Sequence, residues 1–145
     1  MSASHLEALF PALAASQYSV TSPQDRRYNC IAWSAGNVRA WWWPAPGGYW
    51  PPGLPRALSV ESFVRLFASL GYAICDDDVV EEGFEKVALY VGADGMPSHA
   101  ARQLPSGSWT SKLGRLEDIE HASPDGVCGD QYGSVGRIFR RRVGR

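Results

Sequence analysis

The sequence has 145 residues, of which 45% are hydrophobic and 20% charged, and its formal net charge is -1. This length and composition suit a hydrophobic core, so we expect residues 1–145 to fold as a single domain. No apolar run approaches the roughly 20 residues that cross a bilayer, and the basic residues do not form the large patch that general nucleic-acid binding requires. We therefore expect a cytoplasmic protein whose partners are neither membranes nor nucleic acids; the oligomeric state stays open.

The N-terminus carries no charged region followed by a long apolar core, so no secretion signal is expected, and export by a dedicated machine stays open. Residues 2–16 are predicted to be helical. Leu6, Leu9 and Leu13 recur at helical spacing, while Pro11 weakens the middle of the segment.

A polar loop is predicted over residues 17–29, and a short helix with a cysteine in its first turn follows it. Asn29 suits the N-cap, because its side-chain oxygen can accept a bond from a free amide, and Gly36 suits the C-terminal end. The helix dipole and the free N–H groups favour the thiolate of Cys30, which is the nucleophilic form. A buried, inert cysteine is the alternative, since free cysteines are among the most buried residues.

The three cysteines are an odd number with wide spacing, which does not predict a disulfide framework and suits a reducing compartment. They are Cys30, Cys75 and Cys128, and none belongs to the closely spaced pair typical of a zinc site. The acidic run over residues 76–85 lacks the alternation of an EF-hand loop and is predicted to be a solvated connector. We therefore expect no metal and no other cofactor.

Residues 37–58 combine five large aromatic side chains with a density of proline and glycine that forbids regular structure. Aromatic side chains in such a loop either pack against the domain or line a groove that binds a ligand, and one loop can do both. The candidate ligand-binding residues of this loop are Trp41, Trp42, Trp43 and Trp50.

An amphipathic helix over residues 59–70 begins at the N-cap Ser59 and ends at Gly71. Period-two alternation and the Asp94-Gly95 turn signal then predict an antiparallel meander. The predicted strands cover 72–75, 84–92, 96–104, 108–113 and 134–142, and residues 114–121 are predicted to be a helical turn or loop. These elements predict an α+β fold in which N-terminal helices pack on a small antiparallel sheet.

A nucleophilic cysteine needs a base within hydrogen-bond reach, and the base needs a third group that orients it. His99 is the preferred base because it lies inside a predicted strand, whereas His5 is expected at the surface and His121 remains an alternative base in an acidic turn. Gln103 and Asp118 are the candidates for the third group, Gln103 because it shares the face of His99. The next strand also offers the hydroxyls of Ser108, Thr110 and Ser111.

A cysteine on a helix, followed by a histidine on a sheet strand, resembles the order of papain-like cysteine hydrolases. Residues 28–30 also resemble the helix start of NlpC-type cell-wall peptidases. The resemblance implies a papain-like or NlpC-like fold. It also implies an oxyanion-hole role for Gln24, six positions before Cys30.

Several motifs together resemble a family of uncharacterised bacterial domains. This resemblance extends from about residue 28 to residue 133 and implies one structural unit, without an established activity. The motifs are Tyr28-Asn29-Cys30-Ile31-Ala32-Trp33, Trp41-Trp42-Trp43-Pro44, His99-Ala100-Ala101-Arg102-Gln103, Trp109-Thr110-Ser111-Lys112-Leu113-Gly114, Asp118-Ile119-Glu120-His121 and Tyr132-Gly133.

Two functions from different classes agree with these residues. The first is a cysteine hydrolase or acyltransferase acting on a peptide or protein, in which Cys30 forms a thioester, His99 transfers the proton and Gln24 stabilises the oxyanion. The second is a non-catalytic module in which Cys30 and His99 are core residues and the aromatic loop binds a peptide, glycan or protein. The hydrolase requires the sulfur and the imidazole to lie within hydrogen-bond reach of each other. A minor alternative is a nucleic-acid role or a metal-dependent one, in which Cys30, His99, Asp118 and His121 meet at a metal.

Overall fold

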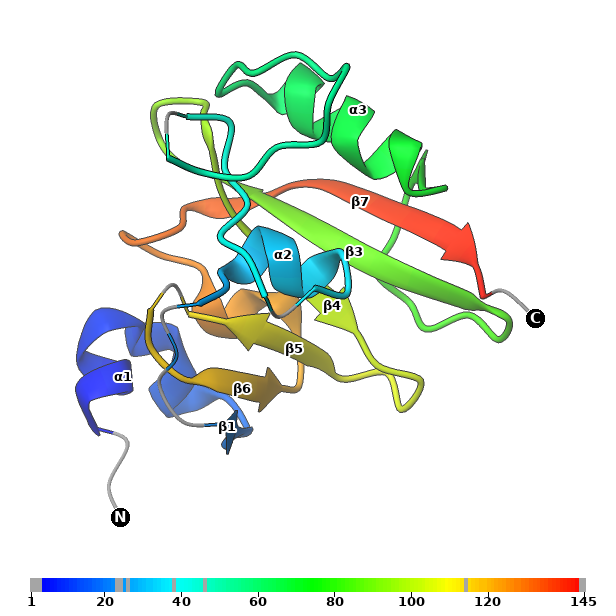
Figure 1. Ribbon diagram of the computed structural model, residues 1–145. Coiled ribbons are helices and arrows are strands. Elements are labelled where there is room, and N and C mark those ends of the chain that lie inside the picture. Colours follow the sequence, from blue (N-terminus) through cyan, green and yellow to red (C-terminus); the bar gives the residue numbers. More distant parts are fainter. Residues whose placement is uncertain are drawn as a thin grey trace.

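The computed structural model describes residues 4–22, 25, 27–37, 39–45, 47–113 and 115–143. Within these residues, seven strands form one antiparallel sheet in the order β1-β6-β5-β4-β3-β7-β2 (Figure 1). The strands are β1 (Tyr18–Ser22), β2 (Ala73–Cys75), β3 (Phe84–Val91), β4 (Pro97–Gln103), β5 (Trp109–Lys112), β6 (Asp118–His121) and β7 (Ser134–Arg142). The helices are α1 (Ser4–Leu9), η1 (Pro11–Ala15), α2 (Cys30–Ser34), α3 (Val60–Ser69) and η2 (Pro124–Val127).

The predicted fold class is wrong, because the sheet dominates the molecule and the helices are short additions to it. The described helices α1 and α2 have six and five residues, so neither forms the helical layer expected of a papain-like arrangement. Pro11 explains the first difference: it opens a separate 3-10 helix at a position where its missing N–H removes no helical bond.

The predicted meander is confirmed by the pairing of β3 with β4 and of β4 with β5. Gly95 adopts a φ of 81° in the hairpin turn, which glycine reaches without steric cost. The predicted last strand is also confirmed: β7 pairs with β3 along its length and with β2 on its other side.

Two strands lie where the sequence predicted loops. β1 forms inside the polar segment 17–29 and pairs with β6, which itself replaces the helical turn predicted over 114–121. Most side chains of β1 are exposed, because it is an edge strand of the sheet. Its residues therefore lack the alternating apolar pattern that a half-buried strand requires.

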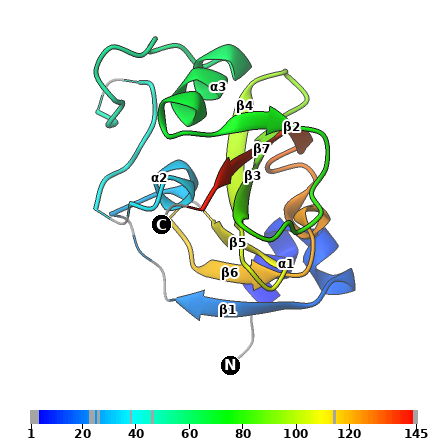
Figure 2. The same cartoon turned by 90° about the vertical axis from the view of Figure 1, so that its right-hand side faces the viewer.

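Alternation along β4 separates two hydrophobic clusters on opposite faces of the sheet. Ala100 and its cross-strand neighbour Leu89 belong to the cluster covered by α2 and α3, which we call the α2 face. Ala101 and its neighbour Ala88 belong to the cluster covered by α1 and η1, which we call the α1 face. Figure 2 shows α2 and α1 on different sides of the curved sheet.

The helix α3 agrees with its predicted capping. The side chain of Ser59 accepts a bond from the amide of Ser62, and Gly71 follows the helix with a φ of 95°. Phe63 and Phe67 lie fully buried on its inner side, against the α2 face of the sheet. Among the described residues, no helix has the length and apolar character needed to cross a membrane.

Candidate functional site

Cys30 begins α2, and the predicted N-cap is present. The side-chain oxygen of Asn29 accepts a bond from the amide of Ala32 at 3.1 Å. Cys30 itself is only 5% exposed and packs in the cluster of the α2 face. Burial raises the pKa of Cys30 to about 11, and the amide of Ala100 and the charge of Lys112 oppose this rise only in part. The thiol is therefore protonated at neutral pH, whereas catalysis needs the thiolate.

The structure does not bring Cys30 and His99 together. Ala100 faces Cys30 on the α2 face, and successive residues of a strand point to opposite faces. His99 therefore points to the α1 face, where its ring contacts Tyr90 with centroids 4.9 Å apart. The predicted pairing of this sulfur with this imidazole is not formed, and the sheet itself separates the two groups.

His99 instead belongs to a buried chain of hydrogen bonds that runs across β4, β5 and β6. Its Nε2 lies 2.9 Å from Oγ of Ser111, and the same Oγ lies 2.8 Å from Nε2 of His121. Nδ1 of His121 lies 2.7 Å from the carbonyl oxygen of Ser123. Ser111 is one of the three hydroxyl residues that the sequence offered as a partner of His99.

The hydrogen bonds of His99, Ser111 and His121 allow one consistent set of proton positions. A carbonyl oxygen only accepts, so Nδ1 of His121 carries the proton and donates it to Ser123. Burial lowers the pKa of His121, so its ring is neutral and its Nε2 accepts from the hydroxyl of Ser111. His99 then donates from Nε2 to Ser111, and its Nδ1 keeps a lone pair that has no partner among the described residues.

Aromatic rings close this chain from solvent. The rings of His99 and Tyr132 stack with centroids 4.0 Å apart and planes 5° apart. Burial, together with the neighbouring His121, holds the pKa of His99 well below its usual range. His99 and Ser111 are both fully buried, so the hydroxyl of Ser111 is not accessible to a substrate. These residues therefore form a buried polar network of the core.

The other predicted catalytic residues do not contact His99. Nε2 of Gln103 donates to the carbonyl oxygen of Asp78 at 2.8 Å. Asp118 is buried on the α2 side, where it accepts from the hydroxyls of Tyr28 and Thr21, both at 2.9 Å. Neither side chain orients the imidazole. Gln24, the predicted oxyanion-hole residue, lies outside the described residues.

Lys112 holds the segment that precedes α2. This fully buried lysine donates to the carbonyl oxygens of Asp25 at 2.6 Å and of Leu116 at 2.7 Å. Its Nζ also lies 5.0 Å from the centre of the Tyr28 ring. No sequence pattern indicates this role, because a lysine on a strand is ordinarily exposed.

The aromatic loop is anchored at two tryptophans, which are buried in the α2-face cluster: Trp42 is 8% and Trp50 3% exposed. The Asn29 side chain donates to the Trp42 carbonyl at 2.7 Å and accepts from its amide at 3.0 Å. The indole N–H of Trp50 donates to the carbonyl of Pro55 at 2.9 Å, and its ring contacts Phe63. Two of the four predicted ligand-binding residues are therefore anchors of the loop.

The remaining aromatic side chains of the loop are partly exposed. Trp41 and Trp43 are half-buried, and Tyr49 is 44% exposed. The Tyr49 ring lies 5.0 Å from the buried Trp42 ring, and its amide donates to the carbonyl of Trp41 at 2.8 Å. The loop thus presents aromatic rings whose backbone is already fixed.

Two arginines that the sequence analysis missed lie on tryptophans next to this loop. The guanidinium of Arg102, from β4, lies 4.5 Å from the ring centre of Trp33 in α2. The guanidinium of Arg115, from the turn after β5, lies 5.8 Å from the ring centre of Trp41. Each pair joins residues far apart in the chain, so no local sequence pattern predicts the contact.

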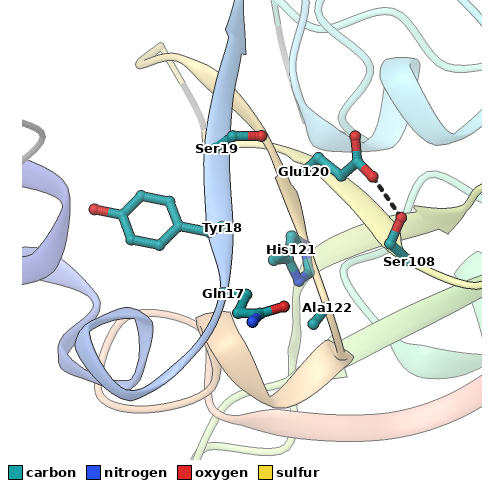
Figure 3. Close-up of a pocket in the computed structure, with 7 residues that line it drawn as sticks. All are labelled: Gln17, Tyr18, Ser19, Ser108, Glu120, His121 and Ala122. Atoms are coloured by element: carbon teal, nitrogen blue, oxygen red, sulfur yellow. Dashed lines mark hydrogen bonds between the residues drawn. The ribbon is translucent and has the colours of Figure 1, made fainter.

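A shallow pocket of about 290 Å³ lies beside β1 and β6, at the β1 edge of the sheet (Figure 3). His121 lines it, but both ring nitrogens of this residue are already bonded within the protein. The hydroxyl of Ser108 donates to Glu120 at 2.6 Å at the opposite wall. Ser108, Glu120 and His121 are thus already hydrogen-bonded within the protein. In the part of the chain that the structure describes, no three His, Cys, Asp or Glu side chains are grouped as a metal site requires.

Comparison with known proteins gives one match. A family model described as a domain of unknown function, DUF7689, matches residues 19–140. No curated protein matches the chain, and no solved structure matches it. The expected resemblance to an uncharacterised domain family is therefore confirmed, and no comparison supports the papain-like resemblance.

Proposed function

The chain belongs to the DUF7689 family, a domain of unknown function, and from its own geometry we propose that it is a binding module for a protein partner, which docks on the aromatic loop. The observation that carries this proposal is that the aromatic side chains of the loop differ in burial. Trp42 and Trp50 are buried anchors, whereas Trp41, Trp43 and Tyr49 remain partly exposed.

Rigid, partly exposed aromatic rings suit protein recognition. Tyr and Trp are enriched among the residues that contribute most to binding energy, because they bury much area and have few side-chain torsions to fix. Asn29 holds both backbone groups of Trp42, so the neighbouring Trp41 is positioned before a partner arrives. A surface that is ordered in advance loses less conformational entropy on association.

The environment of Cys30 supports a binding role over a hydrolytic one. Its thiol has a raised pKa, and the nearest predicted base points to the other face of the sheet. Without a neighbouring base, a buried thiol stays in its unreactive form. Cys30 then acts as a small packing residue at the start of α2.

The test is a selection of random displayed peptides on the folded protein, followed by measurement of affinity with the purified peptides. Wild-type protein is expected to bind selected peptides, and the double variant Trp41→Ala, Tyr49→Ala is expected to bind them at least about tenfold more weakly. The control is Val79→Ala, which truncates a 63% exposed side chain outside the loop. Equal binding by the double variant and by wild type would show that the loop is not the docking site.

A further inference from the structure

Two guanidinium groups on the α2 face carry charge that nothing in the described structure neutralises. Arg102 stacks on Trp33 and Arg115 lies over Trp41, and within the described residues neither makes a hydrogen bond or an ion pair. A guanidinium is always charged at neutral pH and presents five N–H donors in a planar fork. Stacking on an indole leaves these donors at the edge of the plane available to an acceptor.

The carboxylates of this part of the molecule already have other partners. Asp118 accepts from Tyr28 and Thr21, and Asp25 is bonded by the guanidinium of Arg27 at 2.7 Å. Elsewhere in the sheet, Arg140 and Arg141 are paired with Glu81 and Glu85, whereas Arg142 has no ion pair within the described residues. Arg102 and Arg115 differ from Arg142 in that they lie on tryptophans, in α2 and in the aromatic loop.

The indole of Trp33 supplies a further unmet donor. Its Nε1 is buried and has no hydrogen-bond partner among the described residues. The guanidinium of Arg102 lies over the Trp33 ring, and the centres of the Trp33 and Tyr28 rings are 5.8 Å apart. An unbonded buried N–H is unfavourable, so acceptors beside it are favoured. The ring of Trp33 thus gives the guanidinium of Arg102 an apolar surface to lie on, while its own N–H stays buried.

We propose that the partner of the aromatic loop presents an acidic segment, whose carboxylates pair with Arg102 and Arg115 while its apolar side chains contact Trp33 and Trp41. This inference rests on the proposed protein-binding function and adds the chemistry of the partner. Carboxylate pairs bidentately with a guanidinium, and Arg beside Trp is a typical combination at the centre of protein interfaces.

A single-stranded nucleic acid is the competing occupant, because aromatic rings and arginines also bind bases and phosphates. Such binding depends on a basic groove that follows many phosphates, whereas this protein has a net charge of -1. A short acidic peptide meets these conditions better than a polyphosphate chain.

The first experiment compares the composition of displayed peptides before and after selection on the 145-residue protein. The proposal predicts enrichment of Asp and Glu together with apolar residues. Peptides that bind the loop without acidic enrichment would overturn the acidic partner and leave the protein-binding function in place. A selection that yields no binding peptide would contradict both proposals.

The second experiment measures the affinity of a selected, fluorescein-labelled acidic peptide by anisotropy. The double variant Arg102→Gln, Arg115→Gln is expected to bind at least about tenfold more weakly at low salt and to lose most of the salt dependence. The control is Arg142→Gln, because Arg142 also stacks on a ring, that of Phe84 at 5.0 Å, but lies on β7 away from the loop. Thermal unfolding of each variant checks that it is folded.

Three results would overturn the acidic partner. One is equal affinity of the double variant and wild type. Another is displacement of the peptide by an oligonucleotide at lower concentration than by unlabelled peptide. The third is a double variant whose peptide affinity keeps the salt dependence of wild type.

Discussion

On the α1 face of the sheet, buried polar side chains form a chain of hydrogen bonds, whereas on the α2 face two arginines lie on tryptophans without an ion pair among the described residues. His99, Ser111 and His121 form a closed chain behind the ring of Tyr132. Across the sheet, Arg102 and the indole N–H of Trp33 lack hydrogen-bond partners within the described residues. A hydrogen-bonded network of buried groups stabilises the core, whereas guanidinium groups without an ion pair can bind a partner, so we infer a structural role for one face and recognition for the other.

The largest expected effect separates anchors from presented side chains on the α2 face. Trp50→Ala removes a buried ring and an indole bond to Pro55, so we expect a loss of about 3–5 kcal/mol in the free energy of unfolding. Trp41→Ala truncates a half-buried ring and is expected to cost less than about 1 kcal/mol. Urea denaturation measures both. Similar losses would mean that Trp41 is also a structural residue, which removes the division on which the proposed function rests.

The next effect tests how the loop is held. Asn29→Ala removes the N-cap bond to Ala32 and both bonds to Trp42, and these together predict a loss of about 2–3 kcal/mol. The matched control is Asn37→Ala, whose side chain accepts only from the local amides of Arg39 and Ala40.

The Asn37→Ala variant is expected to lose about 1 kcal/mol or less, because its turn is local and partly solvated. Asn29→Ala is also expected to weaken peptide binding, since Trp41 loses its fixed position. If both variants lose the same stability, the clamp on Trp42 contributes nothing beyond an ordinary cap.

The closed network of the α1 face predicts sensitivity to acid. Burial depresses the pKa of His99 and of His121 in the folded protein, so the unfolded chain binds more protons than the folded one below its ordinary histidine pKa. The contribution of the two neutral histidines to the free energy of unfolding is therefore complete above that pKa. It falls as the pH decreases from about 6.5, by up to about 1.4 kcal/mol per pH unit for each histidine.

Urea denaturation between neutral and mildly acidic pH measures this slope. The double variant His99→Gln, His121→Gln is expected to be less stable at neutral pH, because the chain through Ser111 is broken, and to show a shallower decrease towards acid. An equal slope in the variant and in wild type would show that these two rings do not stay neutral in the fold.

Local pattern predicted the middle of this fold and missed one end of the sheet. The strands from Phe84 to Lys112 were predictable because β3 has a short, nearly continuous apolar centre and Asp94-Gly95 marks a turn. β1 and β6 were not, because their residues become strand only by pairing: the exposed β1 completes the edge, and Asp118 is buried only because Tyr28 and Thr21 bond it. Tertiary contacts of this kind leave no periodic signal in a single sequence.

The candidate site shows the same limit. The N-cap Asn29 and the helix start at Cys30 follow from local chemistry, and both were predicted. That His99 and Cys30 are separated follows from which face of β4 receives α2, and alternation alone gives two faces without saying which one the helix covers. The contact of Arg102 with Trp33 likewise depends on that choice, so it became visible only in the folded chain.

The smallest expected effect is at Cys30, and it bears on the comparison most directly. A thiol with a pKa of about 11 is ionised in only about one molecule per thousand at pH 8, so iodoacetamide is expected to alkylate Cys30 more slowly than the less buried Cys75 and Cys128. Cys30→Ala is expected to lose about 1 kcal/mol of stability and to leave peptide affinity unchanged within about twofold. Unfolding in urea is expected to remove the difference in labelling, since it arises from burial. Preferential alkylation of Cys30 in the folded protein would mean that the α2 face holds an activated nucleophile, and a hydrolytic role would then explain its unmet donors better than a docked peptide does.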